Sequence, residues 1–184
     1  NFSIEGISKS PAVFDYDKLT WFNAEYLRAM PQDTFIEAAM PYFQQVFGDK
    51  KMNWPVLASI LQPRVTKLTE IPEIIGFFQE LPEYPVDLFV NKKSKTNLEN
   101  SVTMLEAAIA ELESVSDWQL ETIHDQLIAL AQRLEVKNGT LLWPVRIAAA
   151  GKQVTPGGAM EILAILGKEE SLRRLRVGLE KLKK

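Results

Sequence analysis

The stretch Thr155-Pro156-Gly157-Gly158-Ala159-Met160-Glu161-Ile162-Leu163 decides the fold class of this chain of 184 residues. Its proline fixes φ for a turn, and its two glycines permit positive φ and the close approach of a backbone or a ligand. Its threonine is a residue type that caps the free N–H groups of a following helix. Gly167 then ends this helix, and Leu172-Arg173-Arg174-Leu175 belongs to a basic helix after it. The segment therefore predicts two consecutive helices, and the polar start of the first suits a phosphate or a base edge.

Helical periodicity also dominates the chain before this stretch, and no segment alternates as a pair of strands does. In the first half, proline, glycine and capping residues divide the helices. We expect a first helix over 16–30. A second helix is opened by the capping box Thr34–Glu37, bent or split by Pro41, and ended by Gly48. A third begins at Asn53 and is disrupted by Pro63, and a fourth has Pro72 in its first turn.

The polar, lysine-rich segment 91–97 marks an internal boundary. After it the pattern predicts five more helices, over 97–114, 116–134, 139–149, 158–166 and 168–182, with a capping box at Ser116–Gln119. The sequence thus predicts an all-α fold with two consecutive helical subdomains, 31–93 and 94–184.

Composition excludes several kinds of site. The chain has no cysteine and one histidine, so disulfides, thiolate metal sites and cysteine nucleophiles are absent.

No apolar run approaches the ~20 residues that span a bilayer, so we expect no membrane association and a cytoplasmic location. The first residue is not methionine, and we expect the sequence to come from the interior of a longer chain.

The net charge of −3 argues against a generally basic coat for nucleic acid, although the charges are segregated. Residues 99–135 carry eight acidic side chains and one basic one, whereas residues 168–184 carry seven basic and three acidic ones. This asymmetry indicates one face for a polyanion, with a solvated helix surface as the alternative.

We find no catalytic or metal-binding set. His124 lies in the middle of a helix without a second histidine or a nucleophile near it, and Glu111 and Glu113 occupy different helix faces. No phosphate-binding loop of the G-x-x-x-x-G-K-[ST] type occurs. Ser8-Lys9-Ser10 is similar to part of the ATP-contacting loop of class I aminoacyl-tRNA synthetases, but no nucleotide-binding fold precedes it. We therefore predict neither catalytic residues nor a bound cofactor in this chain.

Several basic and aromatic residues are candidates for nucleic-acid contact. Lys18 and Trp21 share one helix face, with Arg28 further along, and the alternative is a tryptophan packed in the core. Arg64 directly follows Pro63, and two roles are open for it: capping carbonyl groups of the helix, or reading a base edge. Arg146 lies one turn after a tryptophan and a proline, in an otherwise apolar helix. Because an unpaired buried charge is costly, we expect it to pair or to face a cleft. For Arg173, Arg174 and Arg176 we expect a solvated face.

These segments, in this order and spacing, resemble the C-terminal part of the bacterial glutamyl-tRNA synthetases. The resemblance covers nearly the whole chain, more loosely between Lys92 and Gly139. It rests on residues 7–15, Lys18-Leu19-Thr20-Trp21-Phe22-Asn23, Tyr26-Leu27-Arg28, Gln62-Pro63-Arg64, Pro72-Glu73, Pro144-Val145-Arg146-Ile147-Ala148, the turn at 155–158, and 165–169 with 172–175. It implies an all-helical region that binds the anticodon arm of the tRNA for glutamate, preceded over residues 1–30 by the end of a stem-contacting region.

The resemblance also implies roles for single residues. Lys18, Trp21 and Arg28 would belong to a helix along the tRNA stem, and Arg64 would contact the third anticodon base and prefer C there. Arg146 would lie against the first anticodon base, with Thr155, Pro156, Gly157 and Gly158 lining a pocket for the first two. The turn is one residue longer than in some relatives, which leaves Gly158 or Ala159 to pack on a base.

ATP and magnesium would belong to a separate catalytic domain of a parent enzyme, which we expect to be monomeric. We expect no DNA partner. The competing hypothesis is an all-helical protein-interaction scaffold whose basic C-terminal helix meets an acidic partner.

Overall fold

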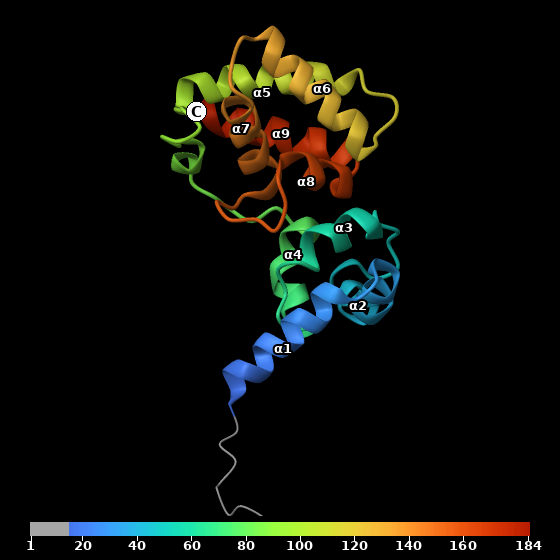
Figure 1. Cartoon of the computed structure of the whole chain (residues 1–184). Helices are drawn as coiled ribbons and strands as arrows, with labels where there is room; N and C mark the ends of the chain where they lie inside the picture. The colour runs from blue at the N-terminus through green and yellow to red at the C-terminus, as the bar shows by residue number, and fades with distance from the viewer. Residues whose placement is uncertain (1–14) are drawn as a thin grey trace, which may run out of the picture.

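In a computed structural model of the protein, residues 15–184 are described, and they form α-helices joined by loops (Figure 1). The helices are α1 (Tyr16–Ala29), α2 (Gln32–Phe47), α3 (Trp54–Leu61), α4 (Ile71–Gln79), α5 (Leu98–Glu113), α6 (Leu120–Arg133), α7 (Asn138–Ala150), α8 (Ala159–Leu166) and α9 (Lys168–Leu182), with 3-10 turns η2 (Leu68–Glu70) and η3 (Val86–Phe89). Over residues 15–184 the only β feature is an isolated bridge between Asn91 and Thr96. The all-α prediction is confirmed.

Most helix ends lie where local sequence signals predict them. The Asn53 side chain accepts a hydrogen bond from the Val56 N–H at 3.3 Å and begins α3. That helix ends two residues before Pro63. Gly48 ends α2 with a φ of 58°, a conformation that glycine adopts at little cost.

Two capping boxes were misread, and the split predicted as one alternative at Pro41 does not occur. α2 begins at Gln32 without a side-chain cap, before the predicted box at Thr34, and α6 begins at Leu120 rather than within Ser116–Gln119. Pro41 neither splits nor ends α2. It lies on the exposed face, while Phe35 and Phe43 bury the opposite face and hold the helix in the core. The tertiary packing of that face outweighs the missing N–H.

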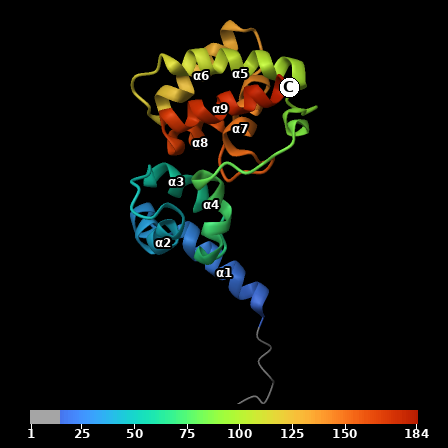
Figure 2. The ribbon, with the colours of Figure 1, turned by 180° about the vertical axis from the view of Figure 1, so that it is seen from behind.

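The helices form two groups, which we call the first half (α1–α4) and the second half (α5–α9) (Figures 1 and 2). In the first half, α2 packs against α3 and α4, and the rings of Phe43 and Trp54 stack with centroids 5.3 Å apart. The Gln62 amide ties α1 to this group by donating to the carbonyls of Leu27 and Met30, at 2.9 and 2.6 Å. These carbonyls lie at the C-terminal end of α1, where the Leu27 carbonyl accepts only a long bond of 3.4 Å from the Met30 N–H.

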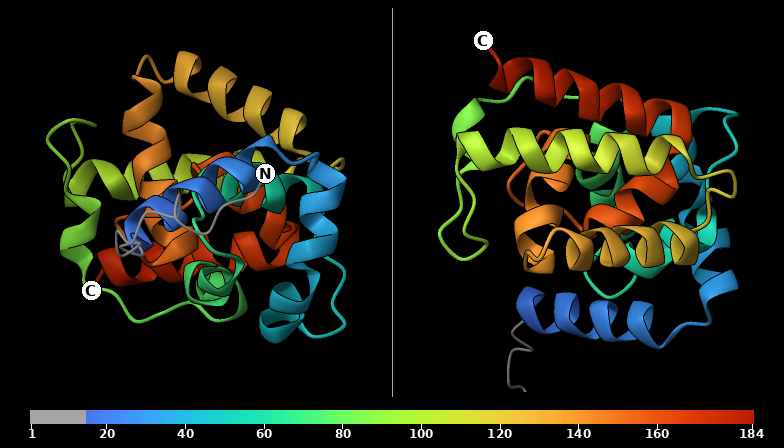
Figure 3. Two further views of the ribbon diagram at one scale, coloured as in Figure 1. Left: turned by 60° about the horizontal axis from the view of Figure 1, so that its bottom comes forward. Right: turned by 90° about the horizontal axis from the view of Figure 1, so that it is seen from above.

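In the second half, α9 packs against both α5 and α7, and α5 and α9 run side by side (Figure 3). A Cβ at Gly178 would lie 2.6 Å from the Ala148 Cβ, so only glycine lets α9 approach α7 this closely. Arg176 of α9 bonds Glu113 of α5 at 2.7 Å, and Lys183 pairs with Glu106. The basic helix therefore meets acidic residues of its own chain, and the scaffold hypothesis loses the free basic face on which it rests.

The connection after α4 packs on the second half. η3 contacts α5 and α7, and the Leu88 carbonyl accepts a hydrogen bond from the Trp143 indole at 2.9 Å. Gly151, with a φ of 63°, ends α7 where a side chain would strike Pro82 and Tyr84. α3 of the first half contacts α8 of the second. Between residues 15 and 184, no helix combines the length and the apolar character needed to cross a membrane.

Candidate RNA interface

Arg146 lies on α7, where neighbouring side chains fix its guanidinium. Its Nη1 donates to the Thr155 hydroxyl oxygen at 3.0 Å, and its Cζ lies 4.6 Å from the centre of the Trp143 ring. Partial burial lowers the pKa of Arg146 from its ordinary range, yet an arginine stays charged at neutral pH. Nε and Nη2 make no hydrogen bond to any of residues 15–184, so these donors are left for a ligand. Its partners are thus a hydroxyl and a ring, and no ion pair joins Arg146 to another of residues 15–184.

The turn 155–158 is built differently from what its sequence predicts. The Thr155 hydroxyl donates to the Gly157 carbonyl at 2.7 Å and does not cap α8, whose N-cap is Gly158. Neither glycine of the turn has a positive φ; Gly158 lies at −79°. Gly157 allows close approach instead, because a Cβ there would lie 3.1 Å from Ile60 Cγ2 of α3, a tight contact. The turn therefore packs against the first half, and its threonine accepts the hydrogen bond from Arg146.

A shallow hollow of about 270 Å³ lies beside the guanidinium of Arg146. It is lined by residues of α7, of the start of α8 and of the loop before α5: Ser94, Gly139, Leu142, Trp143, Arg146, Gly158 and Ala159. Gly158 and Ala159 thus both line it, and of the two only Ala159 has a methyl group to offer.

Arg64 lies on the first half and is exposed. Its Nη1 donates to the Ile60 carbonyl at 2.8 Å, so the guanidinium folds back on the last turn of α3. This is the carbonyl cap that the sequence left open as one alternative. The same Ile60 presents its side chain to Gly157. One residue of α3 therefore touches both Arg64 and the turn that supports Arg146, and the structure brings these elements to one seam between the halves.

Lys18, Trp21 and Arg28 lie apart from that seam, on α1, which projects away from the second half (Figure 1). Trp21 is 57% exposed and makes an edge contact with Phe22, with ring centroids 5.0 Å apart. The alternative of a core tryptophan is wrong. Lys18 is exposed, and Arg28 pairs with Glu25 one turn earlier. α1 thus presents basic and aromatic groups to solvent.

The remaining candidates from the sequence do not form a site with one another. Ser8-Lys9-Ser10 lies outside the described residues. His124 is exposed and lies 3.0 Å from the carboxylate of its neighbour Asp125, while Glu111 and Glu113 pair with different arginines. Across residues 15–184, no three His, Cys, Asp or Glu side chains are grouped to hold a metal ion.

Arg174 is the residue that sequence reasoning missed, because the expectation of a solvated face is wrong for it. Its side chain is fully buried and makes four hydrogen bonds, to Glu170 and to three backbone carbonyls. A signal was present: Arg174 shares the helix face of Ser171, Leu175 and Gly178, all of them buried. Arg173 and Arg176, on other faces, are exposed, as expected.

Residues 24–179 match a family described as the anticodon binding domain, and the chain belongs to that family. The glutamate–tRNA ligase of Clostridium tetani (strain Massachusetts / E88) is 50% identical over 182 residues, which are 99% of this chain and 37% of that protein. The glutamate–tRNA ligase of Clostridium novyi (strain NT) is 45% identical over 185 residues, 99% of this chain and 38% of that protein.

A crystal structure of a glutamate–tRNA ligase from Elizabethkingia meningosepticum, in complex with its amino acid, has a similar fold. It superposes with a TM-score of 0.73 at 25% identity, over 98% of this chain and 35% of that one. This chain therefore spans little more than a third of the length of these relatives. The resemblance found in the sequence is confirmed.

Proposed function

We propose that this chain binds the anticodon arm of the tRNA for glutamate, as the RNA-recognising part of a glutamate–tRNA ligase. The family and the relatives named glutamate–tRNA ligase support this proposal. The observation that carries it is the fixed guanidinium of Arg146 beside the hollow, with two donor nitrogens unused by residues 15–184. ATP-dependent attachment of glutamate belongs in this proposal to a catalytic domain that holds ATP and magnesium.

Arg146 suits recognition of an unstacked base. Sequence-specific RNA binding usually targets loop bases, which are splayed out and read along their edges or stacked on planar groups. The guanidinium lies over the Trp143 ring, and Thr155 holds one of its nitrogens. A base therefore meets donors whose directions are already set, which lowers the entropic cost of binding. We assign the first anticodon base to Arg146 and the turn 155–158.

We assign the third anticodon base to Arg64. Its guanidinium is exposed, and among residues 15–184 it bonds the Ile60 carbonyl alone, through Nη1, which leaves Nε and Nη2 for a base edge. On α1 we assign Lys18, Trp21 and Arg28 to the stem. There the two charged groups meet phosphates, which position the RNA without reading its sequence. Arg28 would exchange Glu25 for a phosphate.

The test is a titration of the chain with anticodon stem-loops that differ at one anticodon position. Arg146→Ala weakens binding of the cognate stem-loop by ~1–3 kcal/mol, and Arg64→Ala reduces the preference at the third base by a similar amount. Arg133→Ala is the matched control, because Arg133 is an exposed arginine of α6 paired with Glu111. Equal binding of all stem-loops by wild type and by both variants overturns the assignment.

A further inference from the structure

Arg174 of α9 joins the two halves through a single buried guanidinium. Its Nη1 donates to the Phe77 carbonyl at 2.7 Å and its Nη2 to the Phe78 carbonyl at 3.0 Å, both in the last turn of α4. Nη1 also donates to the Ala149 carbonyl, at 3.0 Å, in the last turn of α7. One side chain thus holds the C-terminal ends of two helices that belong to different halves.

The chemistry of these ends explains why an arginine lies there. The last carbonyls of a helix lack partners within it, and the helix dipole makes that end negative. A planar guanidinium satisfies several carbonyls in fixed directions, whereas the three donors of a lysine ammonium spread from one point. Glu170 supplies the counter-charge, accepting from Arg174 Nε at 2.6 Å, and Arg173 holds the same carboxylate at 2.7 Å from outside.

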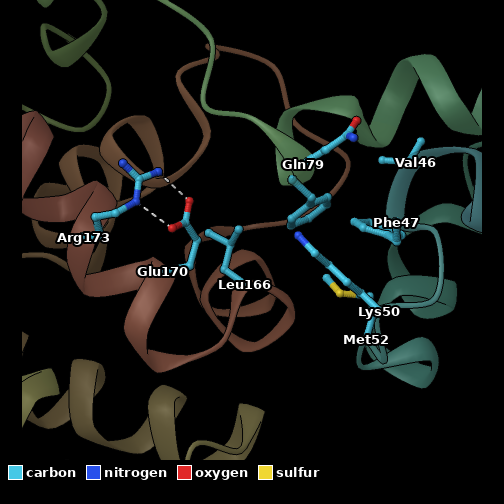
Figure 4. A pocket seen from close by; sticks show the side chains of 9 residues that line it. Val46, Phe47, Lys50, Met52, Gln79, Leu166, Glu170 and Arg173 are labelled. Atoms are coloured by element: carbon cyan, nitrogen blue, oxygen red, sulfur yellow. Dashed lines mark hydrogen bonds and ion pairs between the residues drawn. The ribbon is translucent and has the colours of Figure 1, made fainter.

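Apolar packing does not close the seam beside this bridge. A cavity of about 340 Å³ separates α2 and its following loop from the last residue of α8 and the first turns of α9 (Figure 4). Figure 4 shows Lys50 and Met52 on one side and Leu166 and Glu170 on the other. Because this part of the seam is unfilled, the angle between the halves depends on the contacts that remain. These are the packing of α3 on α8 and on the turn 155–158, the connection after α4, and the Arg174 bridge.

We propose that Arg174 is a positioning residue for anticodon recognition: it fixes the first half against the second and so holds Arg64 at the separation from Arg146 that one anticodon loop can span. The inference rests on the proposed function for its RNA contacts. Its geometric part, the fixed angle between the halves, stands on the protein alone. Arg174 itself touches no RNA, since its side chain is fully buried.

The geometric part is tested by a distance between the halves. The chain has no cysteine, so Glu37→Cys on α2 and Glu121→Cys on α6, both at exposed positions, place one spin label on each half. Arg174→Lys should broaden or shift the distance distribution. Arg173→Lys, which keeps a cation beside Glu170 and leaves the Arg174 bridge intact, should leave it unchanged. An unchanged distribution in folded Arg174→Lys overturns the proposal. Glu170→Gln, which keeps Arg174 but removes its counter-charge, provides a milder variant if Arg174→Lys does not fold.

The recognition part is tested by adding Arg64→Ala to each background. In wild type and in Arg173→Lys it should weaken cognate stem-loop binding by roughly 5- to 150-fold. In Arg174→Lys it should cost less than about 2-fold, because Arg64 no longer reaches the loop when Arg146 is engaged. An equal penalty in all backgrounds overturns the positioning role, even where the label distances change. If Arg64→Ala and Arg146→Ala cost nothing in wild type, the proposed function fails instead, and the label distances still decide whether Arg174 fixes the halves.

Discussion

Arg64 on the first half and Arg146 on the second follow prolines in the sequence, yet the structure holds them in different ways. Arg146 is half-buried, stacked on Trp143 and bonded to Thr155, so its orientation is set before any ligand arrives. Arg64 is exposed and folds back on the carbonyl of Ile60 in its own helix. One guanidinium is half-buried between two neighbouring side chains, and the other is exposed and bonded at one nitrogen.

Because of this difference, the two arginines can contribute unequally to the affinity for an RNA loop and to the choice between loops. A ligand of Arg146 gains its contact without reordering the side chain. A ligand of Arg64 must order an exposed side chain, at a cost of ~0.5–1.5 kcal/mol, so only a base that offers matching acceptors returns a net gain. We therefore expect Arg146 to contribute the larger share of the affinity for the cognate loop, and Arg64 to contribute mainly through its preference at the third base.

The largest expected effect comes from removing the residue that holds the two regions together. Arg174→Ala leaves three buried helix-end carbonyls without their donor and Glu170 with Arg173 as its one remaining partner, and it should lower the free energy of unfolding by about 3–5 kcal/mol. Urea unfolding measures this loss. Arg173→Ala, beside it in sequence but exposed, should cost about 0.5 kcal/mol or less. Similar losses for both variants would contradict the role of Arg174 as the bridge.

Acid should weaken the same bridge. Hydrogen bonds from Arg173, opposed by partial burial and reinforced by those from Arg174, lower the pKa of Glu170 from 4.5 to about 2. Because the folded-state pKa lies below the unfolded one, the carboxylate stabilises the fold fully above pH 4.5. That contribution is lost as the pH falls from 4.5 towards 2, and it amounts to something on the order of 1–2 kcal/mol after solvent screening. Unfolding curves from pH 6 to about 2.5 should show this loss in wild type but not in Glu170→Gln.

The turn that supports Arg146 offers a smaller test with a matched control. Gly157→Ala places a methyl group 3.1 Å from Ile60 Cγ2 and should cost about 1 kcal/mol of stability, and it should weaken stem-loop binding by moving the turn. At Gly158 the methyl group meets only the flexible end of Glu161, at 3.0 Å. Gly158→Ala should therefore stay within about 0.5 kcal/mol of wild type. Thermal unfolding of the two variants gives the comparison, which fails if their order is reversed.

The smallest effect concerns the two arginines in the absence of RNA. Arg146→Ala removes a half-buried hydrogen bond and a cation–π contact and should cost about 1 kcal/mol of stability. Arg64→Ala removes one exposed bond to a helix end and should cost about 0.5 kcal/mol or less. Denaturant unfolding in the same buffer measures both. A larger loss for Arg64→Ala would show that Arg64 is the more firmly held of the two.

Local signals were enough for most of the fold and for part of the site. Asn53, Gly48 and Pro63 act within one turn of themselves, so their helix ends follow from sequence. Thr155 was misread because its hydroxyl meets a guanidinium from another helix rather than the helix that follows it. Arg174 was missed because the nearest of its backbone acceptors, the Phe77 carbonyl, is 97 residues away in the chain. Long-range partners of this kind do not follow from spacing, although the helix face of Arg174 does indicate burial.

The most direct test crosses the two arginine variants with stem-loops altered at the first or the third anticodon base. Each protein–RNA pair forms a double-mutant cycle, and the coupling energy between residue and base is read from four binding constants. The account predicts coupling of ~1–3 kcal/mol between Arg64 and the third base, and between Arg146 and the first base, with values near zero for the two crossed pairs. Coupling near zero throughout, or an exchange of the two partners, would contradict it.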